Sequence, residues 1–273
     1  MTKLTILLSH ERSGSHFLGE FIARLRNVDM LDEVGNPHAI VPGESPLSFF
    51  GFKHEYLLKN PDLMLRPTRD RQAAFVSDYF DHLTGLRPAK HGVVVDIKYG
   101  HVQLFEKNWW PIFERPFLFN VAEERGVRIL HLYRSNVVEA TASSMIADAR
   151  GVWHSWQKKD DATLPTTFTL DPRRLAQKAR LLEFQIRWFQ ATFIGNCERM
   201  TVTYEQLVAE LGVEKSLGKD IARFVGGATG DAYEPRHQKV TPPLSEVIEN
   251  YQEVRAACID AGLGKYVQAQ PRK

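Results

Sequence analysis

Four short apolar runs along the chain have the length and continuity of buried strands. They are residues 4–8, residues 93–97 with Asp96 as an interruption, residues 128–132 and residues 200–203. Runs of this kind are typical of strands covered on both faces, as in parallel sheets. Segments with helical spacing lie between them. The alternation predicts an α/β fold with a mostly parallel central sheet flanked by helices.

Two helices are expected from the spacing of apolar residues, and the one that follows Asp171 is the clearer. Residues 69–84 show helical spacing, with Thr68 as the expected N-cap. A second helix follows Asp171, with Pro172 in its first turn. Its apolar stripe consists of Leu175, Ala179, Leu182, Ile186, Phe189 and Phe193. Residues 34–68 and 154–172 are rich in Pro, Gly and Ser, and we expect them to form loops over the carboxyl edge of the sheet.

The composition narrows the class of protein. The 273 residues are 43% hydrophobic and 25% charged, with a formal net charge of +2, so a large basic surface for nucleic acid is not indicated. The two cysteines, Cys197 and Cys258, lie outside any CxxC pattern, which argues against a disulfide framework and a thiolate zinc site. Both fall in helical patterns, and we expect buried or half-buried free thiols.

The N-terminal segment and the lengths of the apolar runs predict the cellular location of the protein. No apolar run approaches the roughly 20 residues of a membrane helix, so no transmembrane segment is expected. The segment from Met1 to Ser9 lacks the length and cleavage site of a signal peptide, and we interpret it as the first strand. A cytoplasmic protein is therefore expected.

A first candidate site lies between the first strand and the first helix, in the sequence SHERSGSHFLG at residues 9–19. Gly14 permits a tight turn between the small residues Ser13 and Ser15, so backbone N–H groups can converge on an anion at the helix N-terminus. Arg12 adds a fork of donors for phosphate or sulfate oxygens. The sequence matches neither GxxxxGK[ST] nor GxGxxG. A plain Ser/Gly turn remains the alternative.

A second candidate site follows the third apolar run. The strand is expected to end near Tyr133, so that Arg134 leaves the carboxyl edge of the sheet, and a helix begins near Asn136. Ser143 lies about two turns into that helix. Ligands of open parallel sheets collect at this edge. A guanidinium and a hydroxyl suit one phosphate. Taken singly, Arg134 could be an ordinary charged residue at the end of a strand, and Ser143 could be a neutral residue inside a helix.

These two segments resemble the sulfotransferases that use 3′-phosphoadenosine-5′-phosphosulfate (PAPS). RSGSHFLGE, from Arg12 to Glu20, resembles the loop that binds the 5′-phosphosulfate, and YRSNVVEATAS, from Tyr133 to Ser143, resembles the 3′-phosphate motif. The nearest resemblance is to bacterial glycolipid and carbohydrate sulfotransferases of the nodulation-factor and trehalose type. Weaker similarities lie at residues 43–50, 93–99, 149–155 and 202–207.

The resemblance implies a single sulfotransferase domain over residues 1–273, with a P-loop-like sheet and long acceptor-side loops. It implies PAPS as co-substrate, 3′-phosphoadenosine-5′-phosphate (PAP) as product, and no metal. The partner would be a hydroxyl-bearing small molecule, sugar or glycolipid. The sequence identifies neither that acceptor nor the oligomeric state, and a homo-oligomer stays open. Two departures from the family pattern are His16, in place of Ser or Thr, and Ser48, in place of a glutamate that resembles a general base.

Residue roles follow from the resemblance. The 5′-phosphosulfate would contact Arg12, Ser13, Gly14, Ser15, His16 and Phe17, and the 3′-phosphate would contact Arg134 and Ser143, joined by Arg236 and Lys239 unless these are a solvated basic loop. Arg12 and Lys98 would stabilise charge during transfer, although Lys98 could also be a surface lysine. The acceptor side would include Glu44, Ser48 and His54.

The general base is expected to be His101, three residues after Lys98. The placement resembles the Lys-x-His of cytosolic sulfotransferases with one extra residue, Gly100. An imidazole titrates near neutral pH, which suits proton transfer. The alternative candidates for the base are His16, His54 and Glu44. It also remains open that His101 is a loop histidine without a catalytic role. Two other functions remain: a kinase-like protein that binds ATP through the Ser/Gly loop, and a nucleotide-binding protein that has lost turnover.

Overall fold

The computed structural model describes residues 3–35, 49–86, 91–106, 114–151, 166–210, 216–228 and 243–268. The chain forms two compact units. The first unit comprises Met1–Tyr133 and Phe189–His237, and the second comprises Arg134–Trp188 and Gln238–Lys273. The single domain inferred from the resemblance stays a prediction.

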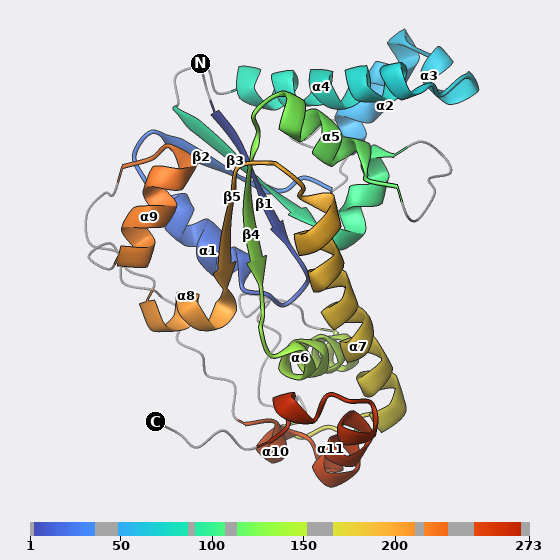
Figure 1. Cartoon of the computed structure of the whole chain (residues 1–273), viewed down its shortest axis with the longest axis vertical. Coiled ribbons are helices and arrows are strands. Elements are labelled where there is room, and N and C mark those ends of the chain that lie inside the picture. Colours follow the sequence, from blue (N-terminus) through green and yellow to red (C-terminus); the bar gives the residue numbers. More distant parts are fainter. Residues whose placement is uncertain are drawn as a thin grey trace. The chain divides into compact units, whose positions relative to one another are not determined.

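A five-stranded parallel sheet forms the centre of the first unit, in the order β2-β3-β1-β4-β5 (Figure 1). The strands are β1 (Lys3–Ser9), β2 (Val28–Glu33), β3 (Gly92–Lys98), β4 (Arg128–Tyr133) and β5 (Arg199–Thr203). The predicted α/β fold with a parallel sheet is confirmed, and the four apolar runs correspond to β1, β3, β4 and β5. Ser9 pairs with Lys98 in register, so the carboxyl ends of β1 and β3 are level.

Strand β2 has no counterpart among the predicted strands. Its sequence, VDMLDE, carries three carboxylates in six residues and lacks a continuous apolar run. It is an edge strand, and its register against β3 shifts between Leu31 and Glu33. This segment therefore forms a strand because its backbone pairs with β3, and its local sequence alone does not indicate one.

Helices cover both faces of this sheet, which explains the continuous apolar runs (Figure 1). On one face, Leu7 and Val94 pack against Phe21 of α1 and Ile221 of α9. Ile6 points to the opposite face by the two-residue alternation, and on that side α4 packs on α5 and against β1. The helical elements of the unit are α1 (Ser15–Ile22), α2 (Phe49–Lys59), α3 (Asp62–Leu65), α4 (Arg69–Gly85), η2 (Tyr99–Phe105), α5 (Phe117–Glu124), η4 (Phe189–Phe193), α8 (Tyr204–Glu210) and α9 (Ser216–Val225).

The prediction of loops over residues 34–68 is wrong for residues 49–59 and 62–65, which form α2 and α3. Phe49 is fully buried, with ring centroids 4.4 Å from Phe105 and 5.3 Å from Tyr79. Aromatic packing on α4 and η2 thus fixes a helix in a stretch whose composition suggests a loop. The predicted start of α4 is confirmed, because the Thr68 hydroxyl accepts a hydrogen bond from the Arg71 amide at 3.3 Å.

The second unit is helical in the part that the structure describes. Its elements are α6 (Val137–Arg150), α7 (Pro172–Trp188), α10 (Leu244–Val247), α11 (Tyr251–Asp260) and η5 (Gly264–Tyr266), and α7 packs against α6 and α11. Helix α7 begins at Pro172 as predicted, and Asp171 Oδ1 accepts the amides of Arg173 and Arg174 at 3.0 Å. The predicted apolar stripe is continuous only to Ile186, since Phe189 and Phe193 belong to the π-helical turn η4 of the first unit.

Both cysteines are buried free thiols, as predicted. Cys258 lies in α11, but the prediction of a helix at Cys197 is wrong, because this residue lies in a bend before β5. Burial raises the pKa of both thiols. Within the described ranges, no helix is both long and apolar enough to cross a bilayer.

A buried histidine holds η2 against the sheet and should make the fold sensitive to acid. His131 of β4 is fully buried, its Nε2 lies 2.5 Å from the Tyr99 hydroxyl, and burial lowers its pKa from 6.5 to about 3. The unfolded chain therefore takes up a proton below pH 6.5 that the native state takes up only near pH 3. We expect His131→Gln to remove an acid-dependent loss of stability of about 1.4 kcal/mol per pH unit in that window.

Urea unfolding between these pH values measures this effect. The exposed His54 of α2 supplies the control, because His54→Gln should leave the pH dependence of the unfolding free energy unchanged. The same slope for His131→Gln and the parent protein would show that His131 does not determine the acid sensitivity.

Candidate functional site

The loop after β1 has the backbone of an anion-binding turn. Arg12 has φ 60° and Gly14 has φ 90°, so two left-handed residues alternate with Ser13 before α1 begins. Such an alternation turns successive N–H groups toward one point. Gly14 is the N-cap of α1 and provides no side-chain cap, so the positive end of the helix dipole is left for an anion.

The side chains of this loop differ in exposure. Arg12 and His16 are exposed, whereas Ser13 and Ser15 are buried. Ser13 Oγ has no hydrogen-bond partner among the described residues. Phe17 is half-buried and packs against the core cluster beneath α1, so its ring contributes to packing. The loop therefore presents backbone N–H groups, a buried hydroxyl and an exposed guanidinium.

Lys98 brings a buried cation to this loop. Its side chain is 7% exposed, so the alternative of a surface lysine is wrong. The ammonium donates to Ser15 Oγ at 2.6 Å, Ser9 Oγ at 3.1 Å and Asp96 Oδ2 at 2.5 Å. The prediction that Lys98 reaches the edge that carries the loop is confirmed. A buried lysine is stable only with such partners, and its three N–H donors match these three acceptors.

His101 and Glu33 extend this cluster. His101 lies in η2 directly after β3, and its Nε2 is 3.5 Å from Glu33 Oε1 at the end of β2. The other carboxylate oxygen of Glu33 is 3.9 Å from Lys98 Nζ. Burial lowers the pKa of His101, the charge of Lys98 lowers it further, and Asp96 raises it in part. The imidazole is therefore mainly neutral at neutral pH.

Glu33 is the member of this cluster that sequence reasoning missed. It lies in an acidic segment outside both recognisable motifs, and the strand that places it was itself not predicted. The available signal in the sequence was an acidic residue at the end of the short segment VDMLDE. The pairing of Glu33 with Asp96 across β2 and β3 is what brings its carboxylate to Lys98.

The second unit holds Arg134 and Ser143, two of the predicted ligands of the 3′-phosphate. Arg134 follows β4 directly, is 8% exposed, and its Nη2 pairs with Glu139 Oε2. Helix α6 begins after Asn136 as predicted, and the Asn136 side chain caps it by accepting the amide of Glu139 at 3.1 Å. Ser143 is half-buried in this helix. The guanidinium of Arg134, which lies between β4 and α6, is thus held by a carboxylate in the first turn of α6.

Four other predicted site residues lie outside the described residues: Glu44, Ser48, Arg236 and Lys239. His54 is described, but it is exposed on α2 and not in a loop. The candidate site in the first unit therefore consists of the loop from Arg12 to Ser15 together with Lys98, Asp96, His101 and Glu33.

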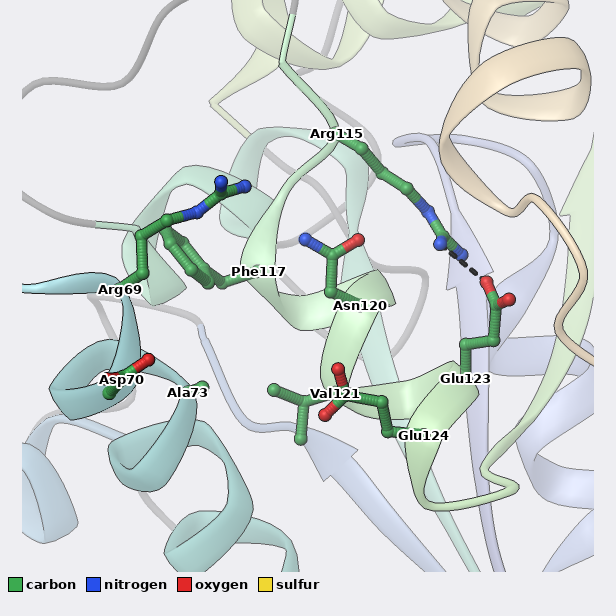
Figure 2. Close-up of a pocket in the computed structure, with 9 residues that line it drawn as sticks. All are labelled: Arg69, Asp70, Ala73, Arg115, Phe117, Asn120, Val121, Glu123 and Glu124. Carbon is green, nitrogen blue, oxygen red and sulfur yellow. Dashed lines mark ion pairs between the residues drawn. The ribbon is translucent and has the colours of Figure 1, made fainter.

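A separate pocket of about 500 Å³ lies between α4 and α5 (Figure 2). Two of the charged residues that line it are paired: Arg115 Nη1 lies 2.5 Å from Glu123, and Arg115 Nε donates to the carbonyl of Phe193 at 2.8 Å. The guanidinium of Arg69 lies 5.8 Å from the ring centroid of Phe117. None of the predicted site residues lines this pocket, so its lining supports the packing of α5 and does not supply the predicted chemistry.

Comparisons with known proteins find only distant similarity. No family model and no curated protein matches the chain. Among solved structures, a sulfotransferase from Alicyclobacillus acidocaldarius aligns at 10% identity and a TM-score of 0.46, covering 99% of this chain and 97% of that one. Mouse sulfotransferase SULT7A1 complexed with PAP aligns at 14% identity and a TM-score of 0.38, covering 98% and 67%.

A third match is the sulfotransferase domain of the Synechococcus PCC 7002 olefin synthase. It aligns at 17% identity and a TM-score of 0.40, covering 100% of this chain and 90% of that one. Identities and TM-scores this low establish neither the family nor the function of the chain. The functional argument therefore depends on the residues of the site.

Proposed function

We propose that this protein transfers the sulfuryl group of PAPS to a hydroxyl of a carbohydrate or glycolipid-like acceptor. The observation that supports this most is the contact of Lys98 with Ser15. It joins a buried cation from the end of β3 to a loop whose backbone suits an anion. Transfer of an anionic group by displacement requires mainly positioning and charge stabilisation, and these residues supply both.

The proposed roles follow the geometry of the first unit. The N–H groups around Gly14 and the guanidinium of Arg12 would hold the 5′-phosphosulfate. Lys98 would stabilise the oxygen that bridges phosphate and sulfur as negative charge develops there. Because all three N–H donors of Lys98 already have partners, donation to this oxygen requires the loss of one of them. Ser9, with the longest of the three contacts, is the partner expected to give way.

The 3′-phosphate would be held by Arg134 and Ser143, which distinguishes PAPS from adenosine-5′-phosphosulfate, a nucleotide without that phosphate. Charge-assisted hydrogen bonds contribute about 1.5–3 kcal/mol each, so we expect the protein to bind PAPS at least about tenfold more tightly. Arg134→Met should abolish most of that preference. Isothermal titration calorimetry with the two nucleotides measures it, and ATP with Mg²⁺ serves as the competing ligand.

The control is Arg150→Met, which changes the arginine at the end of α6. Arg150 lies 4.8 Å from the ring centroid of Phe168 and has no proposed contact with nucleotide, so the preference for PAPS should persist. Equal affinity of the parent protein for the two nucleotides would contradict the assignment of Arg134 and Ser143. Tighter binding of ATP with Mg²⁺ than of PAPS would favour the kinase-like alternative.

A further inference from the structure

Glu33 faces His101, the general base expected from the sequence, and Lys98, which the proposed function uses for charge stabilisation. Its Oε1 lies 3.5 Å from His101 Nε2, and its Oε2 lies 3.9 Å from Lys98 Nζ. The side chain is 21% exposed, so a hydroxyl can approach it. The charged groups that the structure places beside the His101 ring are this carboxylate from β2 and Lys98 and Asp96 from β3.

The second nitrogen of His101 fixes how the ring can be protonated. Its Nδ1 is buried and has no hydrogen-bond partner among the described residues. It packs against the backbone of Gly35, where an added Cβ would lie 2.9 Å from Nδ1. A neutral imidazole carries one N–H, and the stable position for it is Nε2, which faces the carboxylate. The other tautomer would leave a buried N–H unsatisfied and would direct a lone pair at Glu33.

In this arrangement His101 directs an N–H toward a carboxylate 3.5 Å away, and neither of its nitrogens is placed to accept a proton from a substrate. Nε2 already carries the hydrogen, and Nδ1 is closed off by Gly35. The carboxylate of Glu33 is acceptor-only when ionised. It lies 3.5 Å from His101 Nε2 and 3.9 Å from the ammonium of Lys98, whose three hydrogens go to other acceptors. The usual pKa values of the two side chains suggest histidine as the proton acceptor. The geometry instead favours Glu33 for that role.

We propose that Glu33, rather than His101, takes the proton of the acceptor hydroxyl, and that His101 positions Glu33. This inference rests on the proposed function. In the step, the hydroxyl oxygen forms a bond to sulfur while the bond from sulfur to the bridging oxygen breaks. The electron pair of that bond stays on the 5′-phosphate of PAP, beside Lys98. The hydroxyl proton passes to a carboxylate oxygen of Glu33.

The first test needs no substrate. Nitrogen-15 NMR of the full chain with labelled histidine, with the His101 signals assigned from His101→Asn, reports which ring nitrogen carries the proton. We expect the Nε2–H tautomer above the pKa of the ring. In Glu33→Gln, loss of a negative charge 3.5 Å from Nε2 should lower the pKa of His101. An Nδ1–H tautomer, or an unchanged pKa in Glu33→Gln, would overturn the proposal.

The second test is turnover of PAPS with water as the acceptor, measured as release of sulfate. Glu33→Gln should lower the rate at least about 100-fold with the affinity for PAP retained, because a general base contributes 10²–10⁴-fold. His101→Asn keeps an N–H donor and should lower the rate less than about tenfold. The matched control is Glu55→Gln, which changes an exposed carboxylate of α2.

The outcomes separate the inference from the proposed function. A reversed order, with His101→Asn the more damaging change and Glu33→Gln near the parent rate, would make His101 the base and overturn the inference. A parent protein that neither binds PAP nor releases sulfate would contradict the proposed function. The tautomer measurement would still decide whether Glu33 and His101 interact as proposed.

Discussion

Gly14→Val is expected to abolish the binding of PAP. Gly14 has φ 90°, which a β-branched residue adopts only with strain, and an added Cβ would lie 2.6 Å from the Tyr204 ring. Either the ring or the loop must then move, and the N–H groups lose their common direction. Strain of about 1–3 kcal/mol alone corresponds to a loss of up to roughly 100-fold in affinity, and displacement of the loop adds to it. Calorimetry with PAP measures the loss.

The control for this change is Gly126→Val. Gly126 also has a positive φ, 64°, but an added Cβ meets nothing within 4 Å, so it introduces comparable backbone strain away from the loop. It should bind PAP like the parent protein, even if its thermal stability falls. Normal PAP binding by a folded Gly14→Val variant would mean that residues 12–15 are only a turn between strand and helix.

Lys98→Met is expected to damage both stability and turnover. It removes the ammonium that neutralises the buried Asp96, and removal of one partner of a buried ion pair typically costs about 3–5 kcal/mol. Loss of a charge stabiliser for the transition state should lower PAPS turnover by about 10²–10³-fold. Urea unfolding and sulfate release measure the two effects separately.

A double variant separates folding from catalysis. Lys98→Met with Asp96→Leu leaves no isolated buried charge at these two positions, so most of the unfolding free energy should return while turnover stays low. Lys59→Met, in the exposed last turn of α2, is the matched control and should change neither quantity. Parental stability in the single variant Lys98→Met would contradict the buried pair. Turnover restored by the second change would contradict the role of the ammonium.

The sequence was sufficient to predict those parts of the fold that local patterns determine. Strands β1, β3 and β4 were predictable because each is buried between helices and consists mainly of apolar residues, and β5 was predictable from the short run at residues 200–203. The position of Lys98 followed from the same pattern, since parallel strands deliver their last residues to one edge. The N-cap at Thr68 and the start of α7 at Pro172 depend on the chemistry of single residues.

The parts that were missed depend on contacts between segments far apart in the chain. Helix α2 forms around Phe49, whose ring is held by Tyr79 and Phe105, and no local periodicity indicates this. Strand β2 exists through its pairing with β3, and Glu33 becomes part of the site only through that pairing. The closure of His101 Nδ1 by Gly35 is equally non-local. Residue type alone therefore favoured histidine as the base, whereas packing favours the carboxylate.

The two buried thiols have a practical consequence. Cys197 belongs to the first compact unit and Cys258 to the second, and each is shielded from solvent with a raised pKa. Thiolates are the reactive form, so both residues react with a thiol reagent only when their surroundings open. The natural chain thus carries one intrinsic reporter in each unit, and labelling rates of the two cysteines can follow local unfolding of the units independently without any added probe.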